Sequence, residues 1–273
     1  MRLQEYAVSI FKIIPTRSGI KKAIKRKEIL LNGNPAKTSD WIETGQKIEL
    51  LQPEFKQKKI YKLPLEVLFE DEELAIINKP SGIPTSGNYF KTLENTLPFN
   101  LKTSKAKAAL PYALPVHRLD NPTSGLVICA KTRISLTKLQ LQIRAKETQK
   151  TYVAFVKGVP PAQVIYTDSI QNKYAKTILK RMETVIIKHE AFSIVNLFPE
   201  TGRTHQIRIH LSQNGFPIIG DKEYIGVDYF SVKGILLSAI GLQLVHPVTG
   251  EEIKIEIPLP QKFLKIKDLA QNP

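Results

Sequence analysis

The chain has 273 residues, of which 42% are hydrophobic and 24% charged, a composition typical of a folded protein with one large and one small domain. No apolar run approaches the roughly 20 residues needed to cross a bilayer, and no signal-peptide pattern opens the sequence. We therefore expect a cytoplasmic protein without membrane contact. The single cysteine, Cys129, excludes an internal disulfide and a cysteine-based metal cluster, and we expect it to be a small buried hydrophobic residue.

Basic residues are unevenly distributed along the chain. The net charge is +15, and residues 1–60 carry 13 Lys and Arg against 6 Asp and Glu, so +7 of this charge lies in less than a quarter of the chain. A positive field of this kind attracts polyanions such as nucleic acid or an anionic membrane surface. From the charge alone, a basic protein that binds no polyanion is an equally good interpretation.

The first predicted element is a short helix within the stretch TRSGIKKAIKRKEILLNG. Thr16 or Ser18 can cap its start. Ile20, Ala23 and Ile24 recur at helical spacing and form one apolar face. The basic residues on the opposite side are Lys21, Lys22, Lys25 and Arg26. This basic face either contacts phosphates or is simply solvated, as most runs of charge are.

A strand, a turn and a second strand are predicted after this helix. The strands lie at residues 28–31 and 47–50, with a hairpin turn at Asn32-Gly33. With KTSDWIETGQKIEL and its turn at Gly45, this order resembles the small RNA-binding domain named after small-subunit ribosomal protein S-four. Members of that family usually have Ser-Arg-Ser-like residues where this chain has Thr-Arg-Ser. The resemblance implies binding of structured RNA through Arg17, Lys21, Lys22, Lys25 and Arg26.

These features divide the chain into two domains. We expect a small α+β RNA-binding domain at residues 1–52 and a larger domain at 65–273. The segment between them, 53–64, is polar, basic and bracketed by prolines, which is typical of a linker.

The larger domain is predicted to contain many short strands and few helices. The strands are expected at residues 67–69, 74–78, 126–130, 150–159 and 192–198, with a further hairpin around the turn 246–250. One helix is predicted at 134–147. Another is predicted within GRTHQIRIHLSQNG, where Thr204 would cap it and Gly215 would end it, whereas residues 88–113 are expected to be irregular. This pattern indicates an α+β fold with a mixed, mainly antiparallel sheet.

The stretch PVHRLDNPTSGLVICAK places three polar residues at the mouth of a buried strand, His117, Arg118 and Asp120. A serine-hydrolase triad is not supported, because Ser124 lacks the flanking glycines of a nucleophile elbow. The histidines do not group as zinc ligands, since even His205 and His210, five residues apart, do not share a helix face. A dinucleotide-binding fingerprint is also missing. What remains is a carboxylate that acts with cationic and aromatic neighbours, without metal or cofactor.

Five stretches in one order resemble the RluA-type pseudouridine synthases, enzymes that isomerise uridine in RNA. HRLDNPTSGLVICAK looks like the signature of this family, and the others are EDEELAIINKPSGIPT, KTYVAFVKG, TGRTHQIRIHLSQNGFPIIGDKEY and LLSAIGLQLVHPVTG. Together they cover residues 65–260. In the last stretch the family commonly has Leu-His-Ala where this chain has Leu237-Ser238-Ala239. The resemblance implies the pseudouridine synthase fold and an isomerase that uses an aspartate and no cofactor.

The resemblance also implies roles for three catalytic candidates. Asp120 is at the position of the family's catalytic aspartate and would act as nucleophile or base; the residues leave its first chemical step open. Arg208 is at the position of the cation that keeps this aspartate ionised, the alternative being a surface arginine. Tyr152 would stack on the base and serve in proton removal, the alternative being a core aromatic residue of a strand.

Other residues of these motifs are expected to support the site. Arg118 would occupy the gap that an extruded uridine leaves in its stack. His117 is expected to be structural, and the turn 123–125, with its glycine, to present Asp120. The residues expected either to touch phosphates or to order the loop are Arg203, Gln206 and Lys79.

Two functions remain open from the sequence. The first is a cofactor-free RNA uridine isomerase. The second is an RNA-binding or ribosome-assembly factor with a vestigial pocket, which Ser238 and the basic first domain would also fit. A DNA-binding protein is less well supported, because neither a helix-turn-helix nor a zinc-finger pattern occurs. The expected partner is RNA, with large-subunit ribosomal RNA favoured over transfer RNA, and the expected state is a monomer.

Overall fold

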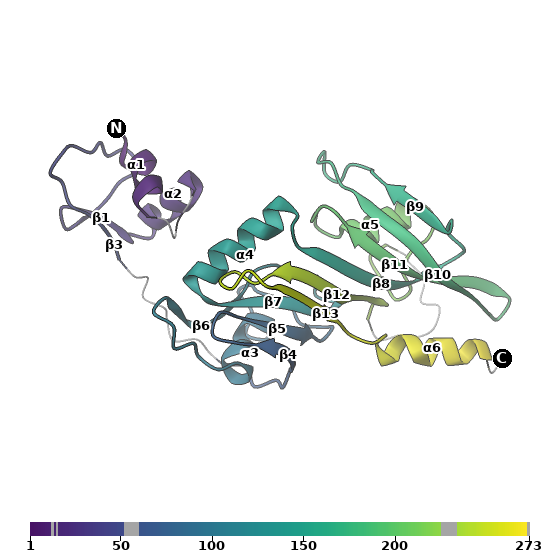
Figure 1. Cartoon of the computed structure of the whole chain (residues 1–273). Helices are drawn as coiled ribbons and strands as arrows, with labels where there is room; N and C mark the ends of the chain where they lie inside the picture. The colour runs from purple at the N-terminus through teal and green to yellow at the C-terminus, as the bar shows by residue number, and fades with distance from the viewer. Residues whose placement is uncertain (12–13, 15, 52–59, 225–233, 272–273) are drawn as a thin grey trace. The chain divides into compact units, whose positions relative to one another are not determined.

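The computed structural model describes residues 1–11, 14, 16–51, 60–224 and 234–271. The chain forms two compact units, Met1–Lys58 and Lys59–Pro273 (Figure 1). Most of the expected linker, residues 53–59, lies outside the described residues. Its remaining part packs on the larger unit, where the backbone N–H of Tyr61 donates to the carbonyl of Asn95 (2.9 Å). No helix within the described ranges is long and apolar enough to span a bilayer.

The smaller unit consists of two helices and a three-stranded sheet. Its elements are α1 (Leu3–Ile10), α2 (Arg17–Lys25), β1 (Ile29–Leu31), β2 (Asn34–Pro35) and β3 (Ile48–Leu50), with the strand order β2-β1-β3. The Thr16 hydroxyl accepts a hydrogen bond from the N–H of Gly19 (3.1 Å), so Thr16 and not Ser18 caps α2. The predicted apolar face of α2 is buried together with Leu3 and Ala7 of α1, a helix that we did not predict.

The predicted hairpin turn at Asn32-Gly33 is confirmed. It joins β1 to β2 with positive φ at both residues, 51° and 79°. A two-residue turn between antiparallel strands requires this conformation, which asparagine and glycine adopt more readily than other residues.

A ten-stranded sheet forms the frame of the larger unit within the described residues (Figure 1). Its central order is β4-β5-β7-β12-β8-β11-β10-β9, with β6 paired to β7 and β13 to β12. All of these pairs are antiparallel except β7–β12, which is parallel, so the predicted α+β class is confirmed. The strands are β4 (Glu66–Glu70), β5 (Leu74–Lys79), β6 (Ala109–Pro115), β7 (Ser124–Thr132), β8 (Gln149–Lys157), β9 (Gln163–Tyr166), β10 (Thr177–Ile187), β11 (Glu190–Pro199), β12 (Leu237–Val245) and β13 (Glu252–Glu256).

Helices cover both faces of this sheet. They are α3 (Leu93–Asn100), α4 (Arg133–Ala145), α5 (Gln206–Gln213) and α6 (Gln261–Gln271). Alternate residues of β7 face α3 and α4: Val127 and Cys129 lie in the core with α3, whereas Leu126 and Ile128 lie with α4. Cys129 is fully buried, and this burial raises the pKa of its thiol, as expected of a structural cysteine.

The alternation predicted for β8 is also present. Tyr152, Ala154 and Val156 belong to one core cluster, and Val153 and Phe155 belong to the other. Strands β9 and β10 and helix α6 were not predicted from the sequence.

The prediction of irregular structure at residues 88–113 is wrong, because this segment contains α3 and β6. Asn95, Thr96 and Pro98 give α3 a weak intrinsic helix preference. Its stability comes from Leu93 and Leu97, one turn apart and both fully buried. Burial of one helix face therefore outweighs the local preference.

The predicted cap of α5 is also wrong, although its predicted end is right. The helix begins at Gln206, and His205 precedes it in a left-handed conformation (φ 54°) without a side-chain cap, so Thr204 does not cap it. The helix ends at Asn214 and Gly215, whose φ of +83° terminates the helical path.

The two halves of the sheet meet where β7 runs beside β12, a contact that we call the seam. It consists of two residue pairs, Ser124 with Ser238 and Gly125 with Ala239. Gly125 has a φ of +117°, and a Cβ atom there would lie 2.1 Å from the carbonyl oxygen of Ala239. Only glycine fits this position, for reasons of both backbone conformation and space.

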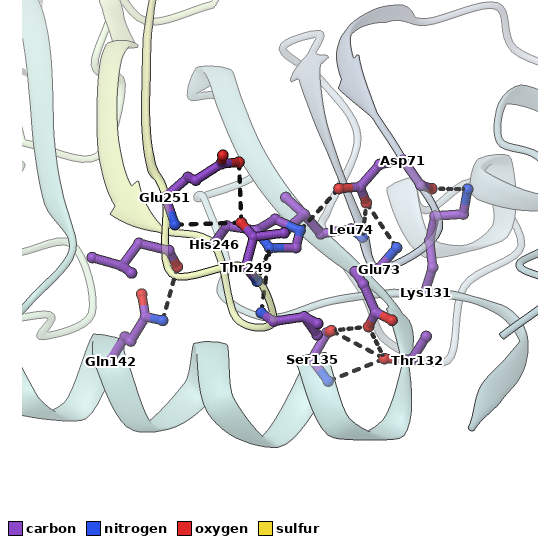
Figure 2. A network of polar contacts seen from close by, with 12 residues as sticks. Asp71, Glu73, Leu74, Lys131, Thr132, Ser135, Gln142, His246, Thr249 and Glu251 are labelled. Atoms are coloured by element: carbon purple, nitrogen blue, oxygen red, sulfur yellow. Dashed lines mark hydrogen bonds and ion pairs between the residues drawn. The ribbon is translucent and has the colours of Figure 1, made fainter. Parts of the chain in front are cut away.

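A polar network far from the seam joins the β4–β5 turn, the start of α4 and the β12–β13 turn (Figure 2). We call it the turn network. Asp71 accepts hydrogen bonds from the backbone N–H groups of Glu73 (2.7 Å) and Leu74 (2.8 Å) and contacts His246 Nε2 at 2.9 Å. His246 Nδ1 in turn accepts from the N–H of Thr249 (2.9 Å). The short bonds of this network fix three chain segments to one another.

Candidate active site

A cavity of about 790 Å³ lies between the loop that precedes β7, the start of β8, and the segment from the end of β11 into α5. This volume is within the range of ligand pockets, about 300–1,000 Å³. Its lining includes the three residues predicted to be catalytic, Asp120, Tyr152 and Arg208. It also includes three of the four predicted substrate-binding residues, Arg118, Arg203 and Gln206.

The loop that carries Asp120 is held rigidly by its backbone. The Thr85 hydroxyl donates to the carbonyl of Leu119 (3.0 Å) and accepts from its N–H (3.1 Å). The carbonyl of Asp120 accepts from the N–H of Thr123 (3.1 Å), which closes the turn. The Asp120 side chain is 19% exposed. A fixed backbone thus presents a carboxylate to the cavity.

Lys79 forms hydrogen bonds to the backbone near this loop and does not line the cavity. Its side chain is completely buried, and its ammonium donates to the carbonyls of Pro80 (2.9 Å), Ile83 (2.9 Å) and Asn121 (3.3 Å). Burial lowers the pKa of Lys79 to about 8, although the charge of Asp120 opposes this effect. Of the two roles expected for Lys79, the geometry supports loop ordering and leaves no access to a phosphate.

Arg208 is buried, and its strongest contacts are with two acidic residues that we did not predict. Its Nε and Nη2 donate to the two carboxylate oxygens of Asp221, both at 2.7 Å, and Nη2 also donates to Glu223 at 2.9 Å. The remaining nitrogen, Nη1, lies 3.8 Å from Asp120 Oδ2. Burial alone would lower the pKa of Arg208, but the bonds and charges of Asp221 and Glu223 outweigh it and raise the pKa.

Arg208 therefore faces Asp120, as predicted, but is not held by it. The bidentate pair with Asp221 fixes the guanidinium, which then presents its third nitrogen to Asp120. Both partners lie in GDKEY, residues 220–224, at the end of one of the five stretches that resemble the family. An acidic residue in a motif that also carries an arginine was the available signal for this pair.

His205 and Tyr224 complete the surroundings of Arg208, and neither was predicted as a site residue. The Tyr224 ring lies 4.8 Å from the guanidinium carbon of Arg208, and its hydroxyl contacts His205 Nδ1 at 3.0 Å. His205 Nε2 lies 3.9 Å from Asp120 Oδ1. The left-handed backbone of His205 turns its ring toward the cavity, a placement that helix periodicity could not reveal.

Tyr152 lies in β8 between the core and the cavity. Its side chain is 9% exposed, and burial, followed by the charge of Asp120, raises the pKa of its hydroxyl. The phenol is thus neutral at physiological pH. Its ring forms part of the cavity lining and part of the core cluster, so Tyr152 is a core aromatic residue of the strand that also reaches the cavity. Its stacking on a base stays a prediction.

Two of the remaining predicted residues lie at the opening of the cavity, and a third orders the loop beside it. Arg118 and Arg203 are exposed at the cavity, and Arg203 Nε donates to the carbonyl of Tyr174 (3.0 Å). Gln206 is buried and orders the loop: it accepts from the N–H of Arg203 (3.0 Å) and donates to the carbonyl of Lys176 (2.9 Å). Its position supports the loop-ordering alternative.

His117 and Ser238 both have structural contacts. His117 Nε2 accepts from the N–H of Ile128 (3.1 Å), and burial holds its pKa well below the ordinary value. Ser238 contacts Ser124 at the seam, with 3.1 Å between the two hydroxyl oxygens, and does not line the cavity. The departure from the usual Leu-His-Ala therefore leaves the cavity lining unchanged. Within the described ranges, no three His, Cys, Asp or Glu side chains are grouped as metal ligands.

Comparison with known proteins identifies the family. Residues 73–213 match the RNA pseudouridylate synthase family. The ribosomal large subunit pseudouridine synthase C of Buchnera aphidicola (subsp. Schizaphis graminum) is 33% identical over 96% of this chain and 91% of its own length. The ribosomal large subunit pseudouridine synthase D of Pseudomonas aeruginosa is 30% identical over 99% and 92%.

The fold is similar to that of a solved human protein, RNA Pseudouridylate Synthase Domain Containing 4. The TM-score is 0.61 with 24% identity, over 76% of this chain and 93% of the human one. The resemblance found in the five sequence stretches is thus confirmed for the larger unit, whereas the likeness of residues 1–60 to an RNA-binding domain stays a prediction. The chain belongs to the RNA pseudouridylate synthase family.

Proposed function

We propose that this protein converts uridine to pseudouridine in large-subunit ribosomal RNA, with Asp120 as the reacting group. The observation that carries the proposal is the position of the Asp120 carboxylate, which lines the cavity beside Arg208 and Tyr152. The choice of ribosomal RNA rests on the relatives, which are named as large-subunit enzymes and are similar over nearly the whole chain.

The reaction requires little besides a positioned carboxylate. The bond from ribose C1′ to N1 of uracil breaks, the base turns, and a bond from C1′ to C5 forms. C5 then loses its proton and N1 gains one, so that the product is an isomer of the substrate. A carboxylate can act as nucleophile or base in the first step if it is ionised and close to the sugar. Arg208 places a fixed positive charge 3.8 Å from the Asp120 carboxylate.

The other cavity residues suit the remaining tasks. Tyr152 keeps its proton, so its ring can stack on uracil while its hydroxyl forms hydrogen bonds to the base. An enclosed carboxylate can reach only a nucleotide that has left its stack. Arg118, exposed at the mouth two residues before Asp120, is placed to enter the resulting gap.

The smaller unit supplies a second RNA contact in this proposal. Lys21, Lys22 and Lys25 are exposed on α2, whereas Arg26 is engaged by Glu28 at 2.6 and 2.7 Å and Arg17 lies 3.6 Å from Glu5. The three lysines are therefore the strongest candidates of the five predicted residues for phosphate contact.

The decisive experiment is a turnover assay on unmodified RNA. Purified wild-type protein is incubated with transcribed large-subunit ribosomal RNA and, separately, with transfer RNA, and pseudouridine is then mapped at nucleotide resolution. We expect conversion of specific uridines in the ribosomal RNA. Absence of pseudouridine from both RNAs would refute the isomerase proposal, and conversion restricted to transfer RNA would refute the choice of substrate.

A charge substitution tests the smaller unit. In the triple variant Lys21→Gln, Lys22→Gln and Lys25→Gln, we expect RNA affinity to fall and the slope of log affinity against log salt to decrease by about 2 to 3, because each lost phosphate contact removes roughly 0.7–0.9 from the slope. The matched control is Lys254→Gln in β13. An unchanged affinity and slope in the triple variant would remove α2 from the RNA interface.

A further inference from the structure

One wall of the cavity carries cations without acidic partners. This wall is formed by the end of α4 and the start of β8, and its basic residues are Arg144, Lys146 and Lys150. Arg144 and Lys146 are exposed, and Lys150 is half-buried and closer to Tyr152 along β8. Within the described residues, none of the three forms an ion pair. We call these residues the α4–β8 wall.

Two cations on the opposite side of the cavity have acidic partners within the described residues, whereas Arg203 on that side donates to the carbonyl of Tyr174. Arg208 is held by Asp221 and Glu223. Lys176 pairs with Glu200, a cavity-lining residue, at 2.7 Å. The charges of Arg208 and Lys176 are therefore compensated within the chain, whereas the three charges of the α4–β8 wall lie together and are available to a ligand.

Lys150 differs from Lys79 and Lys262, two other lysines of the larger unit whose pKa is lowered by desolvation. Burial lowers the pKa of Lys79, Lys150 and Lys262 to about 8 in each case. The ammonium of Lys79 donates to three carbonyls, and that of Lys262 donates to the carbonyl of Ile235 (2.6 Å). None of the hydrogen bonds or ion pairs formed within the described residues involves the ammonium of Lys150, for which desolvation is the sole cause of the shift.

Lys150 is half-buried at the cavity, and its ammonium has no partner within the described residues. A bound anion would supply the missing partner, and the cavity to which Lys150 contributes is open to such a ligand. In an RNA substrate, the anions nearest to a target base are the phosphates on either side of its ribose. A lysine suits such a group, because its ammonium acts as a compact point charge.

We infer that the α4–β8 wall is a phosphate subsite, in which Lys150 binds a backbone phosphate next to the target uridine and Arg144 and Lys146 bind the phosphates that follow. This inference rests on the proposed function, which supplies the RNA. Lys150 is thus a positioning residue: it anchors the strand so that the ribose lies over Asp120. The wall directs the strand past α4, opposite the segment that carries Arg203.

Binding of short uridine oligomers tests this subsite independently of turnover. The dissociation constant of a fluorescent oligouridylate is measured by anisotropy at several KCl concentrations, for the wild type, Lys150→Met, Lys150→Arg and the matched control Lys254→Met. Lys254 is exposed on β13 and carries the same charge. We expect Lys150→Met to weaken binding about tenfold and to lower the salt slope by roughly 0.7, Lys150→Arg to retain most of the affinity, and Lys254→Met to match the wild type.

A second series identifies the atom that Lys150 contacts. Single linkages of the oligomer are replaced in turn by a neutral methylphosphonate. At one linkage the wild type should lose as much affinity as Lys150→Met has already lost, and Lys150→Met should lose nothing further there. If Lys150→Met weakens every oligomer equally, or changes turnover while binding stays at the wild-type level, the subsite does not exist as proposed.

Two further results test the subsite if Lys150→Met folds poorly or if the protein forms no pseudouridine. Lys146→Met, at the exposed rim, should weaken binding about threefold without any effect on the thermal midpoint, so the wall is tested even if Lys150→Met is poorly folded. If the wild-type protein forms no pseudouridine on any RNA but the methylphosphonate series shows the expected coupling, the proposed activity fails and the phosphate subsite stands. If pseudouridine forms but the methylphosphonate series shows no coupling, the phosphate subsite is wrong and the proposed activity stands.

Discussion

The turn network and the cavity each contain an aspartate beside a histidine and a cation, and they differ in how tightly the carboxylate is held. Asp71 accepts two backbone hydrogen bonds at 2.7 and 2.8 Å and contacts His246 at 2.9 Å (Figure 2). The cationic groups that face Asp120 stand farther away, with Arg208 at 3.8 Å and His205 at 3.9 Å. The residue types are similar, but the Asp71 carboxylate is held by short bonds, whereas these contacts of Asp120 are long.

The difference follows from where the short bonds are formed. In the turn network they end on the Asp71 carboxylate itself, so its oxygens are occupied and the β4–β5 turn is fixed to the β12–β13 turn. In the cavity the short bonds end on Arg208, through Asp221 and Glu223. The cation is therefore fixed without consuming the lone pairs of Asp120, which stay available to a substrate. This arrangement is what the proposed role of Asp120 as the reacting group requires.

The largest expected effect comes from the aspartate of the cavity. Asp120→Asn should lower turnover on ribosomal RNA by at least about 1,000-fold, because a neutral amide can act neither as nucleophile nor as base. The thermal midpoint and RNA affinity should remain close to wild type, since few native bonds are lost. Stopped assays of pseudouridine formation, together with thermal unfolding, measure both quantities. Turnover within tenfold of wild type would show that Asp120 is not the reacting group.

Removing the carboxylate that fixes Arg208 should affect stability and activity together. Asp221→Asn breaks a buried bidentate pair, and we expect a loss of about 3 kcal/mol in the free energy of unfolding. The freed guanidinium should then approach Asp120 and bond to it, so turnover should fall by about 100-fold. Denaturant titration and single-turnover kinetics test the two effects. A stable variant with normal kinetics would mean that Asp120 does not depend on the anchoring of Arg208.

Substitution in the turn network should give the opposite result to Asp120→Asn. Asp71→Asn weakens the bonds to Glu73, Leu74 and His246, and we expect a loss of about 1–2 kcal/mol of stability. Turnover measured well below the unfolding midpoint should remain within twofold of wild type, because the network is remote from the cavity lining. A large kinetic defect in this folded variant would abolish the distinction between the two aspartates.

The smallest expected effect is a dependence of RNA binding on pH. The pKa of Lys150 is lowered to about 8, so between pH 7 and pH 9 the free protein loses a charge that the proposed phosphate subsite uses. Affinity for oligouridylate should therefore fall a few-fold over this range. Lys150→Arg should flatten the profile, because arginine stays charged while the other charged groups around the site, His117, Arg118, Asp120, Arg144 and Lys146, are unchanged. Parallel profiles for the two proteins would exclude Lys150 as the titrating group.

Local patterns in the sequence predicted much of the frame. The apolar spacing of α2, the Asn32-Gly33 turn and the alternation of β8 were all correct, because each depends on neighbours a few residues apart. Helix α3 was missed because it depends on contacts with residues that are distant in the sequence. Its stability depends on burial of Leu93 and Leu97 in the main core, and no helical preference within the segment indicates that burial.

Three central residues of the candidate site were predictable, but their bonds and the surrounding residues His205, Asp221, Glu223 and Tyr224 were not. Motif resemblance brought Asp120, Tyr152 and Arg208 together, and the structure places all three at one cavity. The carboxylate that holds Arg208, Asp221, comes from a turn 13 residues later, and its bidentate contact depends on how α5 folds back on that turn. The buried state of Lys79 was likewise hidden, because a lysine between Asn and Pro in a turn-like stretch usually reaches solvent.

The seam at Gly125 has a consequence for the spacing of the reacting groups. Asp120 enters from the β7 half of the sheet, whereas Tyr152 and Arg208 belong to the half that contains β8 and β11. The two halves touch along β7 and β12 through two residue pairs, and one of these tolerates no atom beyond the backbone. The distance between Asp120 and the residues of the other half thus depends on a glycine at the seam. Adding one methyl group there would push β7 away from β12 and increase this distance, although no side chain of the cavity would be altered.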